Sequence, residues 1–167
     1  MKKTEKITTQ ARGNVEFDDA AKYKEGMMPT KVKVSYGAAV DSVQLVYGEN
    51  KSEKHGGNGG SCDEGVIGEG KYIKKIRATK GNFSGVNVLT ALAFYDQDGK
   101  RIAGNERSGD TAEIVADENE CICALCGETV KAGGTGIVSG IGGYTCELPN
   151  MQDLFGMFSN FSGKLKG

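Results

Sequence analysis

Glycine is the feature of this sequence that most limits its fold. The chain contains 26 glycines and only 2 prolines among 167 residues, more than twice the usual glycine share of about 7%. The glycines follow no Gly-X-Y period. Glycine at this density is typical of β proteins with many tight turns and bulges. The chain length is that of one domain, whose apolar core does not require a metal ion or a disulfide.

Alternating apolar residues mark the strands. In residues 31–36 and 40–47 the apolar side chains alternate, which predicts a β-hairpin. Residues 86–95 form the strongest predicted strand, and it ends at the turn signal Asp96–Gly99. Shorter predicted strands occupy residues 71–78, 100–102, 112–115, 121–125 and 136–141. Turns every 8–12 residues, without alternation of strands and helices, predict an all-β sandwich, barrel or prism.

The two ends of the chain differ from its middle. Residues 1–12 are polar and patternless, which predicts a loose N-terminal arm. The domain itself is expected over residues 13–148. In residues 149–167 apolar side chains recur at helical spacing. This spacing predicts a short C-terminal helix over residues 150–162, either packed on its own domain or presented to a partner.

Charge and composition exclude several classes of protein. The 21 basic and 22 acidic residues give a net charge of −1, whereas a nucleic-acid-binding protein normally shows a basic excess. No apolar run approaches the roughly 20 residues of a membrane span. The charged N-terminus is followed by no apolar segment of the signal-peptide type. The sequence therefore predicts a soluble protein without a signal peptide, cytoplasmic by default.

The sequence shows no pair of a nucleophile and a base. His55 is the only histidine, and it begins the loop His55–Gly60, where no carboxylate partner is evident. This loop lacks the Gly-Lys-Ser/Thr end of a phosphate-binding loop and the strand-to-helix context of a dinucleotide site. Among the 22 acidic residues, spacing singles out no pair for glycoside hydrolysis. We therefore expect no enzymatic activity and no cofactor.

The cysteines allow three interpretations. Three of the five fall within six residues and a fourth lies twenty residues further on: Cys121, Cys123, Cys126 and Cys146. Four thiolates can hold zinc tetrahedrally, although the common structural pattern has two C-x-x-C pairs and Cys146 stands alone. The alternatives are free cysteines, or a disulfide such as one from Cys146 to the cluster. The odd number leaves at least one thiol unpaired within the chain.

The order of the segments resembles the jacalin-related lectins. Their "YG", "IDSIQ"-like and "HGGxGG" stretches match VKVSYG (32–37), VDSVQLVYG (40–48) and HGGNGG (55–60). The resemblance continues through residues 70–76, 84–94 and the turn 98–100, and Phe17–Asp19 is similar to the family's first-strand "FDD". It covers roughly residues 13–148. It implies a β-prism I fold, in which three four-stranded antiparallel sheets pack around a pseudo-threefold axis.

The resemblance also implies a sugar site, made by two or three loops at one end of the prism. The family's main loop reads G-x-x-x-D, and in the alignment Gly143 and Glu147 stand at its ends with Tyr144 and Thr145 between them. A carboxylate accepts strong hydrogen bonds from two adjacent sugar hydroxyls. Glycine admits backbone N–H groups close to the sugar, and an aromatic ring covers its apolar face. The other predicted contributors are Gly13, Asn14, Val86 and Asn87.

The sequence therefore predicts a non-catalytic module that binds a mannose- or galactose-type mono- or oligosaccharide. A shallow pocket with few hydrogen bonds binds weakly, so useful avidity requires several sites, through a homo-oligomer or a larger assembly. The alternative is a β-prism with a lost or altered sugar site, which acts as a structural or protein-interaction domain.

Overall fold

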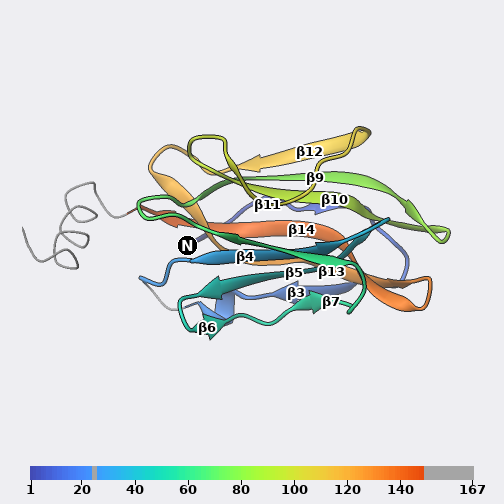
Figure 1. Ribbon diagram of the computed structural model, residues 1–167. Helices are drawn as coiled ribbons and strands as arrows, with labels where there is room; N and C mark the ends of the chain where they lie inside the picture. Colours follow the sequence, from blue (N-terminus) through green and yellow to red (C-terminus); the bar gives the residue numbers. More distant parts are fainter. Residues whose placement is uncertain (24–25, 149–167) are drawn as a thin grey trace, which may run out of the picture.

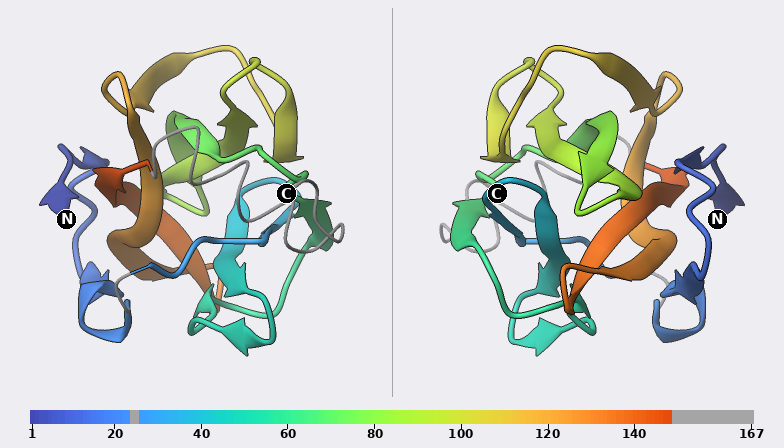
Figure 2. Two further views of the ribbon diagram at one scale, coloured as in Figure 1. Left: turned by 90° about the vertical axis from the view of Figure 1, so that its left-hand side faces the viewer. Right: turned by 90° about the vertical axis from the view of Figure 1, so that its right-hand side faces the viewer.

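Three antiparallel sheets form the fold in the computed structural model, which describes residues 1–23 and 26–148. The sheets lie around a common axis, as the two end-on views show (Figure 2). The predicted all-β prism is confirmed. The predicted helix over residues 150–162, and with it the tail 149–167, lies outside the described residues. No helix of the described part is long and apolar enough to cross a membrane.

The first sheet is built on the longest hairpin of the chain. This hairpin joins β13 (Glu120–Ala132) to β14 (Thr135–Glu147). Three short strands extend it: β3 (Val15–Asp18) pairs with β13, whereas β1 (Lys2–Lys3) and β2 (Ile7–Thr8) pair with β14.

The other two sheets are also built on hairpins (Figure 1). The second sheet has the order β11 (Arg101–Gly104), β10 (Val86–Asp96), β9 (Ile73–Phe83), β12 (Asp110–Val115). The third has the order β6 (Asn50–Lys51), β5 (Val40–Tyr47), β4 (Lys31–Tyr36), β8 (Ser61–Val66), with β7 (His55–Gly56) beside β5. A 3-10 turn, η1 (Ala20–Lys22), follows β3. The predicted hairpin of residues 31–36 and 40–47 is confirmed as β4 and β5.

The inner faces of all three sheets share one hydrophobic core. Each sheet contributes fully buried apolar side chains, among them Val32, Leu45, Ile76, Leu92, Phe94, Ile122 and Leu125. Burying one such side chain stabilises the fold by about 1.5–3 kcal/mol. A smaller second cluster contains Ala11, Ala39, Val88, Val130, Ala132 and Ile137.

Several glycines lie inside strands, where they allow close packing. A Cβ at Gly127 of β13 would lie 2.7 Å from the Phe17 ring. A Cβ at Gly140 of β14 would lie 2.5 Å from a carboxylate oxygen of Glu128. Glycine at these positions therefore allows neighbouring groups to pack closely against the strand backbone. The composition predicts glycines in turns, and the structure has them inside strands as well.

The sequence predicts that residues 1–12 form a loose arm, but in the structure this segment contributes two short strands to the first sheet. Ile7 is buried in the core. The Thr8 hydroxyl donates a hydrogen bond of 2.5 Å to the buried Glu128, and Lys6 lies 3.4 Å from the other oxygen of that carboxylate. Strands of two residues are too short to show a period in the sequence, and their partner lies more than 130 residues away.

We expect Gly56→Ala to destabilise the domain by about 3 kcal/mol or more. Gly56 has a φ of +119°, and a Cβ there would overlap the carbonyl oxygen of Asp41. Left-handed strain costs an L-residue about 1–2 kcal/mol, and overpacking adds about 1–3 kcal/mol. Gly99→Ala is the matched control, because Gly99 has a φ of +81° and open space around its Cβ position. Chemical denaturation measures the free energy of unfolding of both variants. If both lose the same amount, the overlap with Asp41 does not contribute to the cost at Gly56.

Candidate functional site

Three segments meet at one end of the prism, called here the loop end: the loop Thr9–Asn14, the β9–β10 turn and the β13–β14 turn. This end lies on the right in Figure 1 and faces the viewer in the right-hand view of Figure 2. The β9–β10 turn has Ser84 and Gly85 with φ of +52° and +79°. The β13–β14 turn has Gly133 and Gly134 with φ of +60° and +82°. Two consecutive positive φ angles define a type I′ turn, which closes a hairpin tightly.

Hydrogen bonds hold the loop Thr9–Asn14 against two sheets. The Thr9 hydroxyl lies 3.1 Å from the carbonyl oxygen of Asn87 on β10 and 2.8 Å from that of Ser139 on β14. The Ser139 hydroxyl in turn donates to the Asn14 side-chain oxygen over 2.5 Å. The structure therefore brings Asn14 and Asn87, two of the predicted site residues, to the same end of the prism.

A polar cavity of about 590 Å³ opens beside this loop. Its walls carry hydroxyl, amide and charged groups, which come from Thr9, Gln10, Lys80, Asn82, Asn87 and Asp110. Amide side chains both donate and accept hydrogen bonds, and a carboxylate accepts several. Such a wall matches a ligand with many hydroxyl groups, since each hydroxyl is itself a donor and an acceptor.

The remaining predicted residues of this end lie around the loop. Gly13 lines a second cavity, of about 560 Å³, together with Arg12 and Lys131. Its φ is +87°, and no atom lies within 4 Å of its Cβ position. The Val86 side chain is partly buried and packs against the smaller hydrophobic cluster, next to the β9–β10 turn.

The predicted loop Gly143–Glu147 is instead the last part of strand β14. The N–H of Gly143 donates to the Thr4 hydroxyl over 3.0 Å, and its carbonyl accepts from the N–H of Thr4 over 2.9 Å. Both backbone groups are therefore used within the sheet. At about 3.3 Å per residue, β14 spans about 40 Å from its turn to Glu147. Glu147 consequently lies at the end of the prism opposite the loop end.

Tyr144 and Thr145 are also engaged within the first sheet. The Tyr144 hydroxyl donates to the carboxylate of Asp18 over 2.6 Å, and this hydrogen bond raises the pKa of Tyr144 to about 12. Thr145 is buried, and its hydroxyl donates to the carbonyl of Lys2 over 3.4 Å. The structure therefore does not bring the predicted set of residues 143–147 together with Gly13, Asn14 and Asn87.

Three of the four cysteines of the predicted zinc set lie close together, and Cys126 lies apart from them. Cys121 and Cys146 face each other across the β13–β14 ladder, and Cys123 lies on the same part of it. Cys126 is paired with Gly142 further along the ladder. In the described part of the chain, no three or more His, Cys, Asp or Glu side chains are grouped so that they could hold a metal ion. All five cysteines are free thiols in the structure.

His55 has a carboxylate partner that the sequence did not reveal. Its Nε2 lies 2.9 and 3.0 Å from the two carboxylate oxygens of Asp19, and both side chains are buried. The Phe17 ring stacks on the imidazole with the ring centroids 3.7 Å apart. The pair joins β7 to the segment after β3, so the histidine is part of the packing between two sheets.

The family model of the jacalin-like lectin domain matches residues 8–144. The chain belongs to the jacalin-like lectin family. The match begins within the N-terminal strands and includes the loop Thr9–Asn14, in agreement with their place in the first sheet. A search of curated protein sequences finds no significant match.

Solved structures of jacalin-related lectins share the fold. AcmJRL, described as a mannose-binding jacalin-related lectin from Ananas comosus, superposes with a TM-score of 0.67 at 21% identity, over 87% of this chain and 96% of that one. Wild-type Malaysian banana lectin gives 0.66 at 19% identity, over 87% and 97%. The artocarpin–mannotriose complex gives 0.66 at 16% identity, over 86% and 96%.

We expect Thr9→Val to cost about 1 kcal/mol of stability and to loosen the loop Thr9–Asn14. Valine keeps the shape of threonine but removes the hydroxyl that reaches two carbonyl groups, and a typical hydrogen bond contributes about 1 kcal/mol. Thr9→Ser is the control, because it keeps the hydroxyl. Urea denaturation and amide hydrogen exchange of residues 10–14 measure the two effects. Identical behaviour of the valine and serine variants would show that the hydroxyl does not hold the loop.

Proposed function

We propose that this protein is a non-catalytic carbohydrate-binding module that holds a mannose-type mono- or oligosaccharide at the loop end. The observation that carries the proposal is the polar cavity between the loop Thr9–Asn14 and β9–β10, in a chain of the jacalin-like lectin family. The choice of mannose follows two relatives in fold. AcmJRL is described as mannose-binding, and the artocarpin structure contains mannotriose.

In this proposal Asp110 takes the role that the sequence assigned to Glu147. Asp110 begins β12, is exposed and lines the cavity, where its carboxylate can accept hydrogen bonds from two adjacent sugar hydroxyls. Gln10 and Asn87, both exposed, add amide groups that donate and accept. Gly13 and Asn14 shape the loop that forms one wall of the site.

The proposal includes no catalytic step. The one histidine of the chain directs its Nε2 at the buried carboxylate of Asp19, and neither residue lines the polar cavity. A base that activates a nucleophile must lie within hydrogen-bond reach of it. His55 and Asp19 are explained by packing, and the groups that line the cavity are suited to recognition.

Binding to one sugar is expected to be weak. A few hydrogen bonds at an open surface correspond to a Kd between the millimolar and the high micromolar range, about −4 to −6 kcal/mol. Stronger attachment to a glycan then requires several sites, through a homo-oligomer or a larger assembly.

We expect Asp110→Asn and Asn87→Ala each to weaken mannose binding about 5- to 30-fold. The first variant keeps the shape but removes the charge, and the second removes the amide. Hydrogen bonds to charged groups contribute about 1.5–3 kcal/mol and neutral ones about 1 kcal/mol. Calorimetric titration with methyl α-mannoside, mannotriose and galactose measures the change. Glu147→Gln at the opposite end is the matched control and should bind like the parent.

Two outcomes would overturn the proposal. If Glu147→Gln loses binding while Asp110→Asn keeps it, the sugar lies at the other end of the prism. If the parent binds no glycan on an array, the protein is better described as a structural or protein-interaction domain on the same fold.

A further inference from the structure

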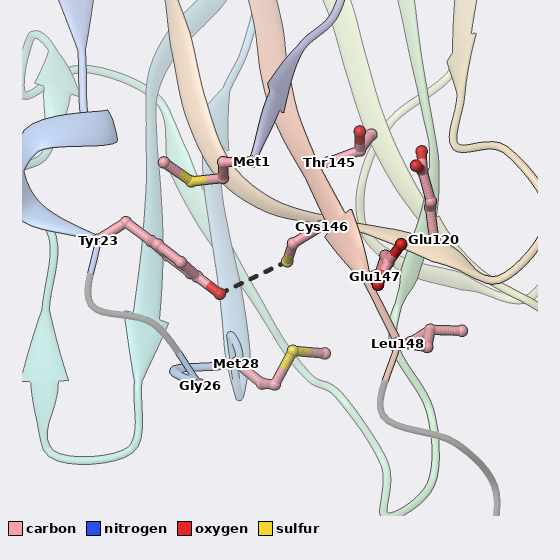
Figure 3. A pocket seen from close by; sticks show the side chains of 9 residues that line it. All are labelled: Met1, Tyr23, Gly26, Met28, Glu120, Thr145, Cys146, Glu147 and Leu148. Atoms are coloured by element: carbon pink, nitrogen blue, oxygen red, sulfur yellow. Dashed lines mark hydrogen bonds between the residues drawn. The ribbon is translucent and has the colours of Figure 1, made fainter.

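A third and larger cavity lies at the opposite end of the prism, called here the thiol end because Cys121 and Cys146 lie there. Its volume is about 860 Å³, and Tyr23, Met28 and Glu147 are among the residues that line it. The half-buried Cys146 also lines it, and its side chain points toward the Tyr23 hydroxyl (Figure 3). A cavity of this size admits a ligand of ordinary small-molecule dimensions.

Cys121 and Cys146 are placed to form a disulfide without movement of the backbone. They are directly opposite in the β13–β14 ladder, and their Sγ atoms lie 3.8 Å apart. Opposed residues of an antiparallel pair have Cα atoms about 4.5 or 5.5 Å apart, and disulfides span Cα separations of about 4.4–6.8 Å. Rotation of the two side chains is therefore sufficient to bring the sulfur atoms to bonding distance.

The two thiols differ in their surroundings. Hydrogen bonds from Cys121 and Cys123, and from the Tyr23 hydroxyl 3.5 Å away, lower the pKa of Cys146 below its ordinary value. The neighbouring Cys146 and burial raise the pKa of Cys121. Cys121 is fully buried, whereas Cys146 is partly exposed to the cavity. Cys146 is thus the more accessible thiol and the one whose ionised form is favoured, whereas Cys121 lies buried beside it. A thiolate, and not a thiol, is the attacking nucleophile.

We propose that Cys146 is a thiol-modification site that reacts with low-molecular-weight disulfides, and that Cys121 is its resolving thiol. The Cys146 thiolate attacks one sulfur of the small disulfide, whose S–S bond breaks and releases one thiolate. The Cys121 sulfur then attacks Cys146 in the mixed disulfide and displaces the second thiolate. The two protein thiols lose two electrons, the small disulfide gains them, and the two thiol protons end on the released thiols.

The product is a bridge between β13 and β14 at the thiol end. It links residues that are 25 positions apart in the sequence, and so restricts the unfolded chain. For a loop of this size in a domain of this length, the gain corresponds to a rise in Tm of about 5–10 °C. The loop end lies about 40 Å away along β14, so sugar binding is not expected to change.

The test uses oxidised glutathione as the small disulfide. The parent for the experiment is Cys62→Ser, because Cys62 is exposed on β8 and would react by itself. We expect this parent to lose two thiols, to carry no glutathione at the end, and to link the peptide of Cys121 to that of Cys146. With Cys121→Ser added, the reaction should stop at one glutathione on Cys146. With Cys126→Ser added as the matched control, it should proceed as in the parent. Mass spectrometry distinguishes these products.

Three results would overturn the proposal. The first is a parent that keeps all its thiols after treatment. The second is glutathione bound stably to Cys146 in the parent, which would show that Cys121 does not resolve it. The third is a bridge from Cys146 to Cys123, which would assign the resolving role to the other thiol. Because the parent's own peptide map decides these outcomes, the test stands even if Cys121→Ser fails to fold.

Discussion

The β13–β14 hairpin is the element on which the rest of the structure depends. Its inward side chains, such as Ile122, Leu125 and Ile141, are fully buried in the core that all three sheets share. Its two outer edges pair with the short strands β1, β2 and β3, which could not persist alone. One ladder therefore holds the N-terminal strands, closes the core and sets the distance between the two ends of the prism.

This ladder separates two kinds of chemistry. At its turn, the loop Thr9–Asn14 and the β9–β10 turn surround a cavity of amides, hydroxyls and a carboxylate, which is suited to recognising a sugar. At its other end, Cys121 and Cys146 face each other beside a larger cavity. The two ends are about 40 Å apart along β14, so no residue lines both cavities.

The sequence predicted the fold better than the site. The alternation in β4 and β5 is a local signal, and so is the apolar run of β10. The strand β14 was harder to predict, because two groups of glycines occur in and beside it. Gly133–Gly136 lie at its turn and Gly140–Gly143 lie in its interior. Only the pairing with β13 and β1 shows that the second group lies within the sheet. For the same reason the sequence indicated neither the place of Asp110 in the cavity wall nor the His55–Asp19 pair, because their neighbours come from distant parts of the chain.

The most direct test of the account is the location of the sugar in solution. Titration of isotope-labelled protein with methyl α-mannoside, followed by amide NMR, reports every backbone position at once. The account predicts that chemical-shift changes are confined to residues 9–14, 80–87 and 110 and to the neighbouring β13–β14 turn. The changes at all these residues should fit a single dissociation constant. Shifts centred on residues 144–147 instead, or no shifts at saturating sugar, would contradict it.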